Sequence, residues 1–130
     1  MFRLRLTTTL AVVLFAASAI GANGQERKRY EMYSWKVKGT WHYSLVEGVG
    51  RVKKYSDVIH SPILARGTSG LEEVLTKLQR GDEIIWMSDV PSGVQKPGSV
   101  SALSFKQPSG KRVKRWIDRC SRLGIRLTLR

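Results

Sequence analysis

The sequence predicts an α+β fold in which an N-terminal aromatic β-hairpin precedes a split β-α-β-β-α-β arrangement. Two observations support this expectation. Apolar residues alternate with other residues over 33–37 and 41–45, which is the pattern of strands with one buried face. Farther along, two segments with apolar residues at helical spacing are each followed by a short apolar run that suits a strand. A small open α/β sandwich is the alternative that the same order of elements permits.

Size and composition limit the possibilities further. The chain has 130 residues, which is enough for one domain and too short for two well-packed ones. Hydrophobic residues make up 42% and charged residues 25%, so the chain can bury a core. A single cysteine excludes an internal disulfide, and with two histidines it cannot make a four-ligand Cys/His zinc site. We expect neither a cofactor nor a metal.

Residues 1–24 have the layout of a secretory signal peptide. A short start with two arginines precedes the apolar run Leu10 to Ala17, and small residues follow. The run is shorter than the roughly 20 residues that a membrane-spanning helix needs. Small residues at the right spacing place cleavage after Ala19 or Gly24. The sequence therefore predicts a periplasmic or secreted protein with one mature domain over 25–130, which touches a membrane only through an uncleaved leader.

The aromatic segment predicts two strands joined near Gly39. The large apolar residues of both strands are odd-numbered, so the loop length decides whether they share a face. A three-residue loop over 38–40 would pair Trp35 with Tyr43 and place all of these side chains on one face. A two-residue loop would divide them between two faces. We therefore expect the three-residue loop.

The segments after the hairpin predict a strand, a helix and another strand. Residues 51–55 suit a short strand or an edge, and 57–64 are expected to be extended. Ser69 and Glu72 form the S-x-x-E pattern of a capping box at the start of a helix. Gly81 is placed to end this helix in a left-handed conformation. The apolar run 83–87 that follows is short enough for a buried strand, and a Pro- and Gly-rich loop comes next.

The second half repeats this order. Residues 100–105 predict a strand, Ser109 caps a second helix, Gly124 ends it, and alternation over 125–130 predicts the last strand. This is the order of the ferredoxin-like fold, in which right-handed crossovers set the two helix-preceding strands side by side in the centre of the sheet. The hairpin would extend the sheet or cover its face. The inner face of the second helix carries Val113, Trp116, Ile117 and Cys120.

Catalytic patterns are weak in this chain. Ser56, Asp57 and His60 are the residue types of a hydrolase, but alternate side chains on one extended segment face opposite ways, and the chain has no G-x-S-x-G motif. The sequence therefore predicts that the protein is not an enzyme. A small hydrolase around these three residues is a lesser alternative.

Positive charge gathers at the C-terminal end. The net charge of the chain is +13, and residues 106–130 hold nine basic residues and one acid. Lys111, Arg115, Arg119 and Arg122 recur at helical spacing and are expected on the outer face of the second helix. Such a stripe suits an anionic polymer or an acidic protein, and export disfavours nucleic acid as the partner.

The starts of the two helices suggest a composite anion site. Helix N-termini present free N–H groups and a partial positive charge, and in the split fold both would emerge at the same end of neighbouring strands. The sequence thus predicts an exported, non-enzymatic binding or interaction protein without fixing its ligand or oligomeric state. The candidate anion-binding residues are Arg66, Ser69, Gly70, Ser109, Gly110, Lys111, Arg112, Arg115, Arg119 and Arg122.

Overall fold

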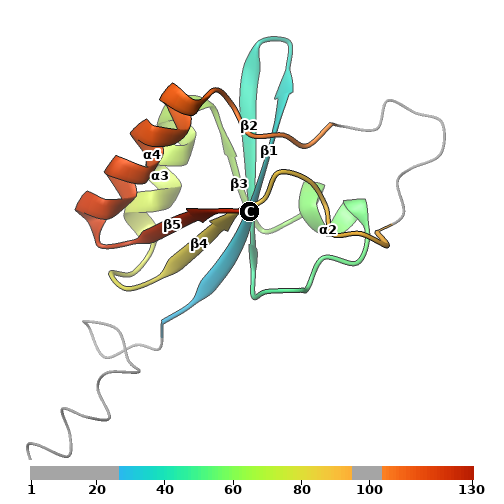
Figure 1. Cartoon of the computed structure of the whole chain (residues 1–130), viewed down its shortest axis with the longest axis horizontal. Helices are drawn as coiled ribbons and strands as arrows, with labels where there is room; N and C mark the ends of the chain where they lie inside the picture. The colour runs from blue at the N-terminus through green and yellow to red at the C-terminus, as the bar shows by residue number, and fades with distance from the viewer. Residues whose placement is uncertain (1–26, 95–103) are drawn as a thin grey trace, which may run out of the picture.

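The computed structural model describes residues 27–94 and 104–130 and shows a five-stranded mixed sheet with three helices (Figure 1). The predicted α+β class is confirmed, whereas the predicted leader and most of the strand expected at 100–105 lie outside the described residues. The strands are β1 (Arg29–Val37), β2 (Thr40–Glu47), β3 (Ile63–Arg66), β4 (Glu83–Trp86) and β5 (Arg126–Leu129), and the helices are α2 (Tyr55–Ile59), α3 (Gly67–Lys77) and α4 (Gly110–Leu123).

The strand order is β3-β2-β1-β4-β5. β2 runs antiparallel to both of its neighbours, whereas β4 is parallel to β1 and to β5. The helix-preceding strand β3 therefore lies at an edge of the sheet, and the expectation that it would be central is wrong. β1 takes the centre because it is buried without interruption from Tyr30 to Trp35, as a strand covered on both faces must be.

The hairpin between β1 and β2 has a two-residue loop, so the predicted three-residue loop is wrong. Val37 pairs with Thr40 and Trp35 pairs with His42. The loop residues Lys38 and Gly39 both have positive φ, at 49° and 83°, as the tight hairpin turns that match strand twist require. The prediction failed because it assumed one buried face, whereas both faces of this sheet are covered.

Two hydrophobic cores fill the two faces, with α3 and α4 on one side and α2 on the other (Figure 1). Tyr43 and Trp86 belong to the core under α3 and α4, which we call the helix-side core. Tyr33 and Trp35 belong to the core beneath α2, the α2-side core. The aromatic residues of the hairpin are thus shared between the two cores.

The segment before β3 is helical where an extended chain was expected. Tyr55 and Val58 are buried and hold α2 against the sheet. The Asp57 carboxylate accepts hydrogen bonds from the backbone N–H groups of Lys53 and Lys54, at 2.8 and 3.1 Å, and so closes the first turn. An acidic cap of this kind favours a helix because it satisfies backbone donors that the helix leaves free.

α3 begins and ends earlier than predicted. Its first residue is Gly67, no side chain bonds to its first turn as a cap, and its last residue is Lys77. The expected capping box does not form, because the Glu72 carboxylate bonds to α4 instead. Gly81 has the predicted positive φ but lies in the turn after the helix.

α4 follows the prediction closely. Ser109 is its N-terminal flanking residue as predicted, although its side chain makes no capping hydrogen bond, and Gly124 ends the helix with a left-handed φ of 78°. Val113, Trp116 and Cys120 are buried, as the apolar stripe predicts. Among the described residues, no helix has both the length and the apolar character needed to cross a bilayer.

Candidate anion-binding surface

The two long helices begin at the same end of the sheet. β3 and β5 run in one direction, α3 follows β3, and α4 precedes β5, so both helices return against the strands. At their other ends, the Gly81 N–H donates a hydrogen bond of 2.8 Å to the Gly124 carbonyl. The free N–H groups of α3 and α4 therefore point toward a common end of the molecule, as expected from the sequence.

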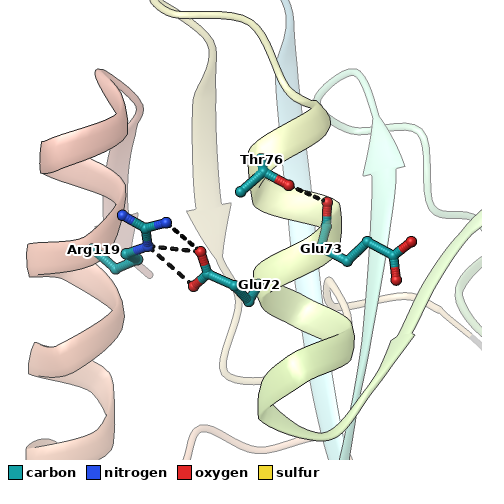
Figure 2. A network of polar contacts seen from close by, with 4 residues as sticks. All are labelled: Glu72, Glu73, Thr76 and Arg119. Carbon is teal, nitrogen blue, oxygen red and sulfur yellow. Dashed lines mark hydrogen bonds and ion pairs between the residues drawn. The ribbon is translucent and has the colours of Figure 1, made fainter.

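An ion pair joins α3 to α4 along their length (Figure 2). Arg119 Nε donates to both carboxylate oxygens of Glu72, at 3.0 and 2.8 Å, and Arg119 Nη2 also donates to Oε2. These hydrogen bonds lower the pKa of the Glu72 carboxyl below its usual value. Arg119 is therefore a neutralised residue between the helices, and its expected place on the outer face is wrong.

Three cations remain on the outer face of α4. Lys111, Arg115 and Arg122 are exposed, and within the described residues no ion pair joins them to an acid. Lys114 is different, because its Nζ lies 3.3 Å from Asp118 Oδ2. We call Lys111, Arg115 and Arg122 the outer basic face of α4.

Arg112 lies on the side of α4 that faces α3. It precedes Arg119 by seven residues, which is two helical turns, so the two arginines share one side. Counting back from the Glu72 pair at 1.5 Å per residue places Arg112 within about one turn of the start of α3. Its side chain is half-buried and lies near the Tyr43 hydroxyl. Burial raises the pKa of Tyr43, and the charge of Arg112 together with the donor groups of Trp116 and Arg112 opposes this rise.

Two buried polar atoms beside Arg112 were not expected from the sequence. The Tyr43 hydroxyl and Trp116 Nε1 are both inaccessible to solvent and have no hydrogen-bond partner. The rings lie edge to face, with centroids 6.4 Å apart. Sequence reasoning assigned both aromatics to the core, which is correct for their rings, and the only signal it overlooked is that each carries a polar atom needing a partner when buried.

The other predicted site residues are scattered. Arg66 follows Ala65, which packs into the helix-side core, so strand alternation directs Arg66 to the opposite face of the sheet. Ser69 and Ser109 are exposed at the two helix starts, and a Cβ at Gly70 would lie 3.6 Å from the backbone of Ala65. Of the three cations expected at the composite site, only Arg112 lies on the side of α4 that faces α3, because Arg66 is on the opposite face of the sheet and Lys111 is on the outer basic face.

The hydrolase alternative gains no geometric support. The Asp57 carboxylate is occupied by backbone N–H groups, and these bonds lower its pKa. Across the described part of the chain, no hydrogen bond links the side chains of Ser56, Asp57 and His60. Cys120 is fully buried, and burial raises the pKa of its thiol to about 12, which suppresses the nucleophilic thiolate.

A pocket at the opposite end of the helices has mixed charge. Its volume is about 340 Å³, and its charged lining consists of four cations, Arg27, Lys28, Arg29 and Arg126, and two acids, Asp82 and Glu83. Glu83 forms an ion pair with Arg29, with Nε and Oε1 3.0 Å apart. Two acids thus offset part of the positive charge in this pocket, whereas no described acid forms an ion pair with the outer basic face. Comparison with protein-family models, with curated proteins and with solved structures gave no match.

Proposed function

We propose that the protein is an exported, non-enzymatic binding protein that holds an anionic polymer on the outer basic face of α4. The observation that carries this proposal is the row formed by Lys111, Arg115 and Arg122, which are exposed and joined to no described acid. At 1.5 Å per residue the row spans roughly 16 Å, long enough to contact several successive anionic groups of one chain. An acidic protein is the other partner that this charge pattern would suit.

The fold itself does not require this row of charge. α4 is held by Val113, Trp116 and Cys120 in the helix-side core and by the bridge from Arg119 to Glu72. Exposed like charges repel one another and add nothing to that packing. A polyanion would remove the repulsion and release counterions, which gives the row a favourable role.

The direct test compares two double variants with the same change in net charge. Arg115→Glu with Arg122→Glu reverses the outer basic face, and Lys53→Glu with Lys106→Glu reverses two exposed cations next to the α2-side core. Binding to heparin and to polyphosphate should weaken at least tenfold more in the first variant. Its log–log salt slope should also fall by roughly 0.7–0.9 for each lost contact, by analogy with nucleic acids.

Equal weakening in the two variants would reject the outer basic face as a binding site. Export is tested separately by the intact mass of protein recovered from the periplasm or medium of a secreting host. The expected first residue is Ile20 or Gln25. Full-length protein retained in the membrane fraction would contradict export.

A further inference from the structure

The end of the α3–α4 pair contains hydrogen-bond donors that lack an acceptor. The Tyr43 hydroxyl and Trp116 Nε1 have no hydrogen-bond partner, and both residues are buried, with only 0% and 3% of their surface exposed. Buried polar groups in native proteins are nearly always bonded, because an unpaired one keeps its full desolvation cost. Two such groups side by side therefore call for a missing partner.

The chemistry around these atoms specifies that partner. The Trp116 ring nitrogen and the Arg112 guanidinium can only donate hydrogen bonds, and both act on the Tyr43 oxygen, whose own O–H stays unpaired. The first N–H groups of α4 also lack an intrahelical acceptor. The Glu72 carboxylate of α3 lies at the level of Arg119, two turns of α4 from Arg112, and is already bound to Arg119. Donors are thus in excess at this point.

We propose that the shared end of α3 and α4 binds one compact oxyanion, a phosphate or sulfate group, through Arg112, Tyr43 and Trp116. Arg112 is half-buried, so the anion approaches from its side and the guanidinium moves outward to admit it. The Tyr43 hydroxyl and the Trp116 N–H then donate to the anion from beneath. This inference deepens the proposed function, because such a group can end or decorate an anionic polymer, but the site itself takes a free anion.

The first test follows the tryptophan side-chain N–H signals by NMR while inorganic phosphate or sulfate is added. The Trp116 signal should move saturably as its N–H gains an acceptor. Trp86 provides an internal control, because its Nε1 already donates to Ser34 Oγ at 2.9 Å. A saturable, Trp116-specific shift with either anion supports the site, and the anion that binds more tightly identifies the source. No Trp116-specific shift up to about 50 mM of either anion, where a weak single-anion site would already be occupied, would overturn it.

Variants then separate this site from the outer basic face. Tyr43→Phe should weaken anion binding about tenfold without lowering thermal stability, because it deletes an unpaired hydroxyl and keeps the ring. Tyr55→Phe, in the α2-side core, is the matched control and should leave binding unchanged. Arg112→Gln should weaken binding at least as much as Tyr43→Phe. Unchanged affinity in both Tyr43→Phe and Arg112→Gln would overturn the proposal.

The two proposals can fail separately. If the outer-face variant Arg115→Glu with Arg122→Glu keeps the Trp116 shift while losing heparin, both proposals stand. If wild-type protein fails to bind heparin or polyphosphate but shows the Trp116 shift, the polymer proposal fails and the oxyanion site remains. If the polymer binds and the Trp116 signal does not respond to either free anion, the oxyanion site fails alone.

Discussion

Polar groups inside this small protein differ in whether their hydrogen bonds are satisfied. Glu31 is 2% exposed, and its carboxylate accepts from the Tyr33 hydroxyl and from the Gly50 N–H. Tyr43 and Trp116 have no such partners. Burial without a hydrogen-bond partner is costly. The unpaired groups of Tyr43 and Trp116, and not the satisfied carboxylate of Glu31, therefore indicate a ligand site.

Cys120 gives a residue-scale prediction about packing. It is fully buried in the helix-side core, and burial raises the pKa of its thiol to about 12. Because the thiolate is the reactive form, iodoacetamide at pH 8 should label the native protein negligibly and label it fully in denaturant. Mass spectrometry measures both. Rapid native labelling would show that the buried face of α4 is assigned wrongly.

Glu72 gives a prediction about pH, because the hydrogen bonds from Arg119 lower its pKa in the folded state. A lowered carboxyl pKa adds stability above the ordinary pKa and loses it as the pH falls, since protonation breaks the bridge. Wild-type protein should therefore lose more thermal stability than Glu72→Gln between about pH 5 and pH 3. Thermal unfolding followed by circular dichroism measures this difference.

The matched control for Glu72 lies next to it on α3. Glu73 pairs with Lys77 within the same helix, at 3.4 Å, and both side chains are largely exposed. Exposed pairs of this kind contribute little. Glu73→Gln should keep the acid sensitivity of the wild type, and an equal loss of sensitivity in both variants would show that the bridge between the helices is not its source.

At the scale of elements, the register of the hairpin is a feature that the local sequence pattern does not determine. Alternation located both strands, but a period of two cannot tell which face each residue joins. Trp35 and Tyr43 were expected to face the same way, and they lie in different cores. The information that decides the register is the coverage of both faces by distant segments, such as α2 and α4, which local patterns do not contain.

The turn of this hairpin gives an element-scale prediction. Gly39 has a φ of 83°, and a Cβ there would meet nothing within 4 Å, so Gly39→Ala carries a conformational cost without a clash. That cost should be about 1–2 kcal/mol. Lys38 also has positive φ, and Lys38→Asn should raise stability by roughly 0.5 kcal/mol because Asn tolerates this region. Chemical denaturation measures both, with Lys36→Asn as the control for charge.

The helices differ in how much of them the sequence predicts. α4 was located to within a residue, because its stripe, its flanking serine and Gly124 agree. α3 was placed too late, because Ser69 and Glu72 imitate a capping box whose glutamate is used by Arg119. The candidate site was predicted in the same uneven way, since the sequence shows the cations of α4 but not the ion pair of Arg119 with Glu72 on α3.

At the scale of the whole molecule, the excess of positive charge affects the stability of the fold. The chain carries +13, and residues 1–24 account for two arginines and no acid, so most of the excess belongs to the predicted mature domain. Five of the described acids sit in ion pairs with nearby cations, namely Glu47, Glu72, Glu73, Glu83 and Asp118. The remaining cations repel one another across a small surface, which disfavours the compact state.

This excess of positive charge predicts that added salt raises the melting temperature of the protein alone and lowers that of the protein bound to a polyanion. For the protein alone, raising NaCl from about 20 to 300 mM shortens the range of repulsion and should increase the melting temperature by a few degrees. With heparin present at low salt, the melting temperature should be higher than that of the protein alone at the same salt. A ligand that binds only the native state stabilises that state. Added NaCl should then lower the melting temperature toward that of the protein alone, since it weakens the contacts made by Lys111, Arg115 and Arg122.

Differential scanning calorimetry over both salt series gives the two slopes. The Arg115→Glu and Arg122→Glu double variant should lose most of the heparin-induced rise and keep its positive response to salt alone, whereas a rise that survives in this variant would assign polymer binding to the general charge of the molecule.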